Sequence, residues 1–127
     1  MLSINAGSSS IRFALYELEP EFRTLLRGKV ERIGFSAANI SVRDADDKQR
    51  YCQDIDASDH GVAVSALMEW LDTQPEFSAV AAVGHRVVHG MQHTKPQQLT
   101  PQLLADLRRI TPFDPEHMPR ELQLIEA

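Results

Sequence analysis

Three short segments of the chain carry residue types and spacings that could do chemistry, and the first two could bind an anion. The first is NAGSSSIRF, from Asn5 to Phe13. Its small residues would let backbone N–H groups and the hydroxyls of Ser8, Ser9 and Ser10 approach an anion closely, and Arg12 adds a fixed positive charge. No Gly-Lys-Ser/Thr sequence follows, so this is not a Walker-type phosphate loop. Taken alone, the segment favours a plain Gly-Ser β-turn over a phosphate site.

The second segment is GHRVVHG, from Gly84 to Gly90, which follows a short apolar run at Val80–Gly84. A run that is apolar on both sides and comes after a helix predicts a buried parallel strand. Ligands of α/β sheets bind beyond the carboxyl ends of such strands, which is where Arg86 stands. A guanidinium there can hold a carboxylate or phosphate in a bidentate fork and neutralise charge during phosphoryl transfer. The alternative is a surface salt bridge.

Histidines also recur in this region, because His85, His89 and His93 are spaced by four residues. On a helix this spacing would align three imidazoles for a metal ion. The glycines at both ends of GHRVVHG and its two β-branched valines argue against a helix. We therefore expect no metal site from these histidines.

The third segment is TPFDPEHMP, from Thr111 to Pro119, which carries Asp114, Glu116 and His117 between prolines. By itself it favours a rigid connector. A proline-rich interaction segment is a more remote alternative.

The elements that must position these segments begin with strands, which are short and apolar or alternate with a period of two. They are Leu2–Asn5, Ile11–Leu18 and Leu25–Ile33. A turn at Gly7 and the serines separates the first two. Ile40–Arg43 and Gln49–Asp54 indicate a polar hairpin, which we expect to be a solvated excursion from the fold.

Three helices are predicted from apolar residues at helical spacing. They are His60–Thr73, a helix from Pro101 to the residue before Pro112, and Arg120–Ala127. Ser58 or Asp59 can cap the first and Thr100 the second. Met68 and Trp70 are expected in the core or in a domain contact. The order of strands and helices indicates an α/β domain, with helices packed on a mixed sheet.

Composition limits the class of protein. The chain has 127 residues, 43% of them hydrophobic, which is one domain's worth of protein. Its formal net charge of −5 lacks the basic excess of a nucleic-acid-binding surface, and its longest apolar stretch is far too short to span a membrane. The single cysteine, Cys52, cannot form an internal disulfide, which fits a reducing, cytoplasmic setting.

Taken together, the three segments resemble the acetate and propionate kinase family, within the actin, sugar kinase and Hsp70 superfamily. The resemblance is carried by INAGSSSIRF, by VGHRVVHG and by the P-x-x-P-x-H-x-P frame at Pro112–Pro119, which LQLIEA follows, and it covers the whole chain. It implies a ribonuclease-H-like (actin-like ATPase) domain. Such a domain is one half of a two-domain enzyme that transfers the γ-phosphoryl group of ATP reversibly to acetate or propionate, with Mg²⁺. The full-length enzyme is expected to be a homodimer.

On the ATP side, the resemblance implies that Asn5 is associated with Mg²⁺. Ser8, Ser9 and Ser10 would lie beside the phosphates of ATP. Arg12 would share that role, standing where the family usually has lysine; an arginine keeps the charge but changes its reach.

On the acid side, the resemblance implies that Arg86 holds the substrate carboxylate and takes part in catalysis. Val88 would form one wall of the small acyl pocket, and His117 would lie in the active-site region. Glu116 stands where a leucine usually lines that pocket, and a carboxylate there would repel the substrate or take up a proton. Met91 follows Gly90 where a second glycine is common, and Met118 replaces an asparagine.

The resemblance also implies that residues 1–127 are the N-terminal domain alone, either as a fragment or as a truncated relative. The second domain would supply the remaining catalytic and adenosine-binding residues, and the isolated chain is expected to be inactive. Its unpaired interdomain surface would expose apolar residues such as Trp70 or the Leu122 face. The alternative is a non-catalytic module that binds an anion or acyl phosphate and pairs with another chain.

Overall fold

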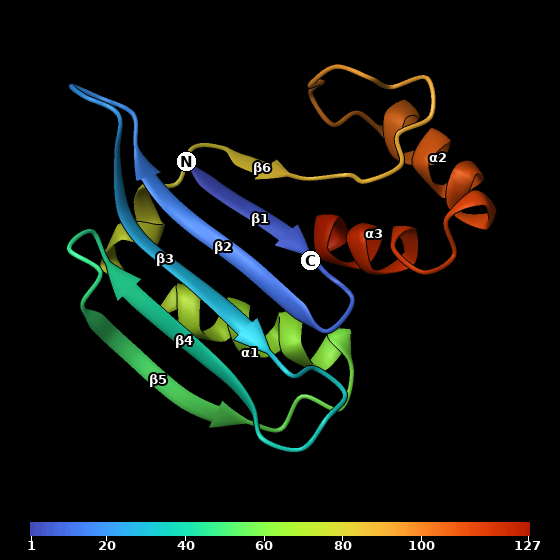
Figure 1. The fold of residues 1–127 in the computed structure, drawn as a ribbon. Helices are drawn as coiled ribbons and strands as arrows, with labels where there is room; N and C mark the ends of the chain where they lie inside the picture. The colour runs from blue at the N-terminus through green and yellow to red at the C-terminus, as the bar shows by residue number, and fades with distance from the viewer.

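A six-stranded mixed sheet forms the body of the protein, with its helices on one side and at one end (Figure 1). The computed structural model describes residues 1–127. The strands are β1 (Leu2–Ala6), β2 (Ser10–Glu17), β3 (Arg23–Glu31), β4 (Ala38–Asp44), β5 (Gln49–Ile55) and β6 (Val83–His85). The helices are α1 (His60–Asp72), α2 (Pro101–Ile110) and α3 (Met118–Glu126), with short 3₁₀ helices η1 (Pro75–Ala79) and η2 (Thr111–Phe113).

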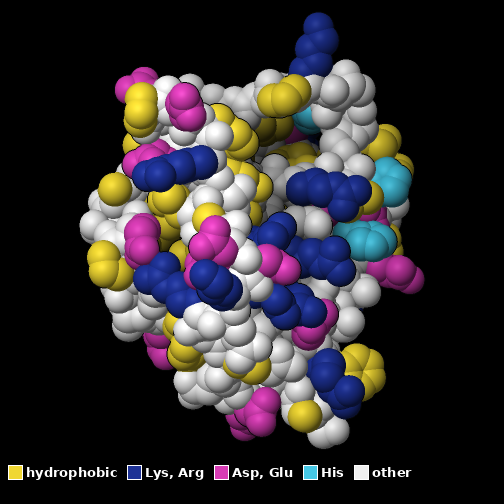
Figure 2. All heavy atoms as spheres, turned by 60° about the vertical axis from the view of Figure 1, so that its left-hand side comes forward, with side chains coloured by type: hydrophobic (Ala, Val, Ile, Leu, Met, Phe, Trp, Pro, Cys, Tyr) yellow, Lys and Arg dark blue, Asp and Glu magenta, His cyan; other side chains and the backbone are white.

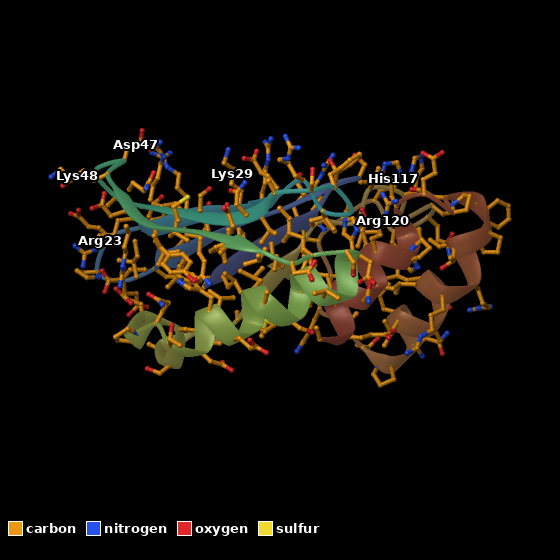
Figure 3. The ribbon with its side chains drawn as sticks, turned by 90° about the horizontal axis from the view of Figure 1, so that it is seen from below. Arg23, Lys29, Asp47, Lys48, His117 and Arg120 are labelled. Atoms are coloured by element: carbon orange, nitrogen blue, oxygen red, sulfur yellow. The ribbon has the colours of Figure 1, made fainter.

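The strand order is β5-β4-β3-β2-β1-β6. The first five strands are joined as antiparallel neighbours, and β6 pairs in parallel with β1. Alternation along β1 buries Leu2, Ile4 and Ala6 on the helical side and turns Ser3 and Asn5 to the opposite face. That opposite face carries no helix, so it is the open face of the sheet (Figure 3).

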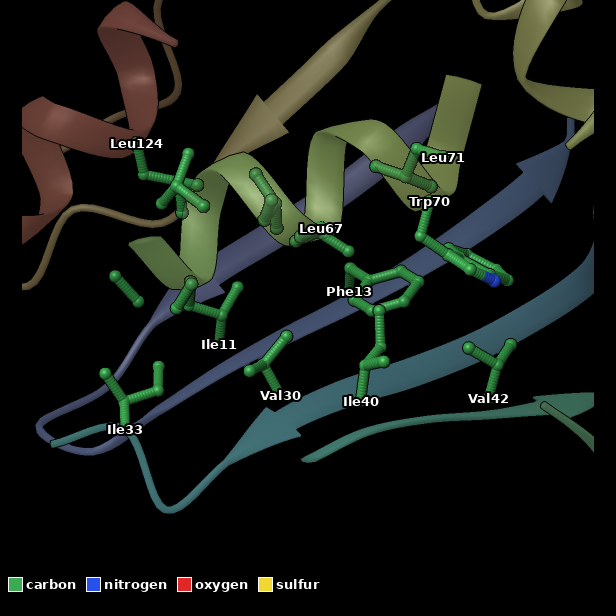
Figure 4. Close-up of a cluster of buried hydrophobic side chains, with 14 of the residues drawn as sticks. Ile11, Phe13, Val30, Ile33, Ile40, Val42, Leu67, Trp70, Leu71 and Leu124 are labelled. Carbon is green, nitrogen blue, oxygen red and sulfur yellow. The ribbon is translucent and has the colours of Figure 1, made fainter. Parts of the chain in front are cut away.

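The main core lies between the sheet and α1 (Figure 4). The Asp59 side chain caps α1 by accepting a hydrogen bond of 3.0 Å from the Val62 N–H. Trp70 on α1 packs against the rings of Phe13 and Tyr51, with centroid distances of 5.8 and 5.5 Å. The Phe13 ring covers the backbone of Gly28 on β3, where no side chain would fit.

A smaller apolar cluster joins α2 to α3 through Leu107, Met118 and Leu122. Thr100 caps α2 by accepting a hydrogen bond of 3.1 Å from the Leu103 N–H. This helical pair lies beside the β6 edge of the sheet (Figure 1). It therefore stands next to the carboxyl ends of β1 and β6.

The structure confirms the α/β class, the mixed sheet, the first three strands and the predicted helices, with boundaries shifted by at most a few residues. The predicted hairpin is confirmed as β4 and β5, and β5 is largely exposed. Its expected exposure was wrong for β4, an inner strand whose Ala38, Ile40 and Val42 are buried on the side of α1. The run at Val80–Gly84 was also predicted wrongly as buried. Only β6 is strand there, and Val83 is 49% exposed because β6 lies at the sheet edge.

Two residues expected on an exposed interdomain surface are buried instead. Trp70 and Leu122 are each only 8% exposed, because Trp70 packs under the sheet and Leu122 packs against α2. The large apolar side chains that do reach solvent include Phe22, Phe35 and Phe113. None of the helices is both long enough and apolar enough to cross a membrane.

Candidate active site

The open face of the sheet brings Asn5, Arg12 and Arg86 around one hollow of about 420 Å³. Asn5 on β1 lies directly opposite Arg12 on β2 in the antiparallel register. Arg86 follows β6, and its N–H donates to the Ile4 carbonyl at 3.2 Å, which extends the pairing with β1 by one residue. Three segments that are distant in sequence therefore meet at one place, and two of the three residues are cations.

Asn5 is the only one of these residues with an orphaned polar atom. Its side-chain oxygen Oδ1 is buried and has no hydrogen-bond partner. A buried carbonyl-type oxygen without a partner fits a cation or a water from its hydration shell, and Mg²⁺ keeps most of its ligands as water and phosphate oxygens. No group of three or more His, Cys, Asp or Glu side chains is placed to hold a metal ion. Asn5 Oδ1 is therefore the side-chain oxygen of this hollow that best fits Mg²⁺ or its water.

The serine segment forms the β1–β2 turn, as predicted for a Gly-Ser turn. The Gly7 N–H donates to the Ser10 carbonyl at 2.7 Å, and His60 Nε2 lies 2.9 Å from the Gly7 carbonyl oxygen. Burial lowers the pKa of His60, and the hydrogen bond to Gly7 opposes that shift. His60 is therefore a neutral donor at pH 7 that anchors the turn to α1.

The serines do not line the Asn5–Arg12–Arg86 hollow. Ser9 and Ser10 border a separate shallow hollow with Arg32 and Phe35, and Ser8 is exposed. The turn reaches the first hollow only through its two flanking residues, Asn5 and Arg12.

On the other side of Arg86, a buried glutamate holds the backbone of the same loop. The Val88 N–H donates to both carboxylate oxygens of Glu121, at 3.1 and 3.2 Å. Glu121 is only 2% exposed, and this burial raises the pKa of its carboxyl group, with the Asp114 charge adding to the effect. The Val88 hydrogen bond and the charges of His117 and Arg86 act in the opposite direction.

Asp114 is the second buried acid, and it lies between two imidazoles. His117 Nδ1 is 2.8 Å from Asp114 Oδ1, and His89 Nδ1 is 2.9 Å from Oδ2. The hydrogen bond from His117 is the main cause that lowers the pKa of Asp114, and His89 adds to it. Asp114 and Glu121 are the only buried polar or charged residues of the chain. Both form hydrogen bonds with the GHRVVHG loop, Glu121 with Val88 and Asp114 with His89.

Further cations extend across the open face from Arg12. A neighbouring hollow of about 370 Å³ is lined by Arg12, Arg27, Lys29 and Arg43. Figure 2 shows Lys and Arg side chains gathered on one face, with histidines at its edge, and Figure 3 shows Lys29 and His117 on the side away from α1. Asp47 pairs with Arg27 and Arg43, and Glu31 with Lys29, whereas Arg12 has no ion-pair partner.

The predicted residues thus fall into two adjoining groups. Asn5, Arg12 and Arg86 share the hollow, while Val88 and His117 adjoin Arg86 through Glu121 and Asp114. Glu116, expected where a leucine usually lines the acyl pocket, is exposed, and its position relative to that pocket stays a prediction.

Sequence reasoning missed the roles of Asp114 and Glu121. A signal for Glu121 existed, because Met118, Glu121, Leu122 and Ile125 share the helical spacing of one face. A carboxylate in the middle of that apolar stripe could have been recognised as buried. Asp114 gave no such signal, since its partnership with His89 joins residues 25 positions apart.

The fold and the site define a class of protein. The antiparallel strands, the helix and the parallel edge strand match the actin-like ATPase fold of acetate and propionate kinases. A family model described as the acetokinase family matches residues 1–127. The chain therefore belongs to the acetokinase family.

Comparisons with individual proteins agree with this family assignment. The chain is 38% identical to acetate kinase of Oceanobacillus iheyensis and 35% identical to acetate kinase 1 of Lactococcus lactis, over 100% and 99% of its length. The crystal structure of Porphyromonas gingivalis acetate kinase superimposes with a TM-score of 0.80 at 26% identity over 98% of this chain. A propionate kinase from Francisella tularensis has a TM-score of 0.83 at 24% identity. The chain spans about a third of the length of these relatives, 32% in each case.

Proposed function

We propose that the chain is the N-terminal domain of an enzyme that transfers the γ-phosphoryl group of ATP to a short-chain carboxylate, acetate or propionate. Residues 1–127 form that domain. Arg86 is the residue that binds the carboxylate, and Arg12 faces the phosphates. The observation that carries the proposal is the meeting of Asn5, Arg12 and Arg86 at one hollow of the open sheet face.

The positive charges of this hollow suit the transfer of a phosphoryl group between two anions, a polyphosphate and a carboxylate. A carboxylate and a polyphosphate repel each other, so a site that joins them must supply fixed positive charge between them. Arg12 and Arg86 line the hollow from opposite sides of β1, and neither has an ion-pair partner within the chain. Both guanidiniums are therefore available to ligands.

The buried carboxylate of Glu121 holds the loop that would bind the carboxylate substrate. Glu121 fixes the N–H of Val88, two residues after Arg86, so the loop that presents Arg86 is tied to α3. Val88 itself is 37% exposed, and an exposed valine beside an arginine suits a short acyl chain. His117 begins α3 on the same side.

Mg²⁺ bound to the nucleotide neutralises phosphate charge during transfer, and Asn5 Oδ1 is the atom of this chain that would hold it or its water. In-line transfer also requires the nucleophile and the phosphoryl group to be enclosed between two surfaces. This chain provides one surface only. We therefore propose that it acts with a second domain and does not catalyse the reaction alone.

The assignment of Arg86 is testable by anion binding to the chain itself. Amide NMR spectra recorded during titration with acetate, and separately with inorganic phosphate, should show shifts at Asn5, Arg86 and Val88. Arg86→Ala should abolish the acetate-induced shifts. Arg109→Ala removes an exposed arginine of α2 that pairs with Asp106, and it should leave them unchanged. Equal acetate binding by wild type and Arg86→Ala would overturn the assignment.

A further inference from the structure

Asp114 occupies an unusual position, because a single buried carboxylate bonds two histidine rings from different segments. His89 belongs to the GHRVVHG loop after β6, and His117 is the residue before α3. Each ring faces a different oxygen of Asp114 through its Nδ1 atom, at 2.9 and 2.8 Å. The His117 backbone N–H also points to Oδ1, at 3.3 Å. Asp114 therefore joins the loop that carries Arg86 to the start of α3.

The chemistry of a carboxylate decides where the ring protons lie. An ionised carboxylate has no proton to donate, so each nitrogen that bonds to it must carry a hydrogen. Both His89 and His117 then hold their hydrogen on Nδ1 when neutral. The Nε2 atom of each ring makes no hydrogen bond within the chain, which leaves it free on the far side of the ring.

The two rings also differ from the other histidines of the chain in exposure and in partners. The His89 side chain is 62% exposed and that of His117 is 36% exposed, whereas Asp114 between them is 8% exposed. By contrast, His85 Nδ1 is buried without a partner, and His60 bonds to a backbone carbonyl. Only at Asp114 does the fold supply a buried acceptor that orients exposed imidazoles.

We propose that Asp114 is a positioning residue, which fixes His89 and His117 as Nδ1–H tautomers and leaves their Nε2 atoms free for a ligand. When the rings gain a second proton, it goes to Nε2, which then donates to an oxyanion. When they are neutral, Nε2 accepts a proton or a hydrogen bond instead. The consequence for the ligand rests on the proposed function, but the tautomer assignment does not.

The test is the protonation state of each ring nitrogen in the purified chain. Long-range ¹H–¹⁵N correlation spectra distinguish a protonated ring nitrogen from an unprotonated one. In their neutral form, both His89 and His117 of the wild-type chain should show protonated Nδ1 and unprotonated Nε2. Protonated Nε2 in either neutral ring would overturn the proposal without any substitution.

Asp114→Asn provides a nearly isosteric challenge. Its amide has one accepting oxygen and one donating nitrogen, so it can accept from only one of the two rings. The other ring should change to the Nε2–H tautomer. Asp114→Glu keeps an accept-only carboxylate and should retain the Nδ1–H form in both rings. Retention of both Nδ1–H forms in Asp114→Asn would contradict the proposal.

A matched control is Asp106→Asn, because Asp106 lies 3.8 Å from a different histidine, His93. It should leave the tautomers of His89 and His117 unchanged. Failure of the proposed function would appear elsewhere, as acetate binding that does not depend on Arg86. The tautomer spectra need no ligand, so the two failures are distinguishable.

Discussion

Substitution of Glu121 separates the two properties of its buried carboxyl group, hydrogen-bond acceptance and charge. In Glu121→Gln the amide oxygen can still accept from the Val88 N–H, but no charge is buried. In Glu121→Leu the acceptor is lost as well. A buried donor without a partner costs about 1–3 kcal/mol, and the lower end applies because this bond is only partly buried. The leucine variant should be less stable than the glutamine variant by about 1 kcal/mol.

The difference in the free energy of unfolding between wild type and Glu121→Gln should depend on pH. Burial raises the pKa of Glu121, so the folded chain holds this proton more tightly than the unfolded chain does. Below the ordinary pKa of a glutamic acid both states are protonated, and the charge costs nothing. As the pH rises from there through the folded pKa, the folded state must give up the proton and loses stability. Wild type should therefore fall in stability relative to Glu121→Gln between acidic and neutral pH.

Urea unfolding followed by Trp70 fluorescence measures both effects. Trp70 is the only tryptophan of the chain and is 8% exposed, so its emission reports the core. With a urea dependence of about 1–3 kcal/mol per molar, a difference of about 1 kcal/mol moves the midpoint by roughly 0.3–1 M. A gap between wild type and Glu121→Gln that stays constant from pH 4 to 8, or widens toward acid, would refute the burial of this charge. Equal stability of the leucine and glutamine variants would refute the hydrogen bond.

Three further predictions concern single positions. Gly28→Ala should lower the free energy of unfolding by about 1–3 kcal/mol, measured by urea unfolding, because a Cβ there would overlap the Phe13 ring; an unchanged midpoint would show that the ring can move aside. Met91 has a φ of 51°, in the left-handed region. This conformation costs a non-glycine residue about 1–3 kcal/mol, whereas the greater flexibility of glycine in the unfolded chain costs about 0.5–1 kcal/mol. Met91→Gly should therefore raise the thermal midpoint and Met91→Val should lower it, whereas the reverse order would contradict a left-handed residue 91. Glu116→Leu should leave the NMR-detected acetate affinity of the chain unchanged, because Glu116 is exposed; a clear gain in affinity would place its carboxylate at the acyl pocket after all.

Local patterns were sufficient for the elements whose signals are local. The alternation of Ile11, Phe13 and Leu15 predicted β2, and Asp59 and Thr100 predicted the starts of α1 and α2. These signals lie within a few residues of the feature they predict. The boundaries were accordingly close to those of the structure.

The errors concern burial, which depends on where a strand lies in the sheet. The β4 segment alternates Ala38, Ile40 and Val42 with polar residues, yet its charged turn suggested a solvated hairpin. Its position between β3 and β5, under α1, is set by pairing with residues distant in sequence. The run before Gly84 failed for the opposite reason, because an apolar composition does not show that β6 would be an edge strand.

The roles of the predicted site residues stay a prediction, and sequence reasoning did not find the buried acids that hold the Arg86 loop. Arg86 could be chosen because it follows an apolar strand, where ligands of α/β sheets bind. Asn5 was chosen through the resemblance to the acetate and propionate kinase family. That they meet Arg12 at one hollow required the parallel pairing of β1 with β6. The bonds of Asp114 and Glu121 to the loop cross 25 and 33 residues, and no local pattern specifies such contacts.

We propose that this chain supplies one half of a phosphotransferase site, in which Arg86 binds the anionic substrate. Trapping acyl phosphate with hydroxylamine tests it directly, using ATP, Mg²⁺ and acetate or propionate. The chain alone should give no product above background, and mixing it with a separately produced second domain of an acetate kinase relative should give turnover. Arg86→Ala in the same mixture should lower that turnover by a factor of roughly 10²–10³, as expected for the loss of one preorganised charge contact. Robust turnover by the chain alone would show that it is not half of a site, and full turnover with Arg86→Ala would show that Arg86 does not bind the substrate. No turnover in any mixture would favour a non-catalytic anion-binding module.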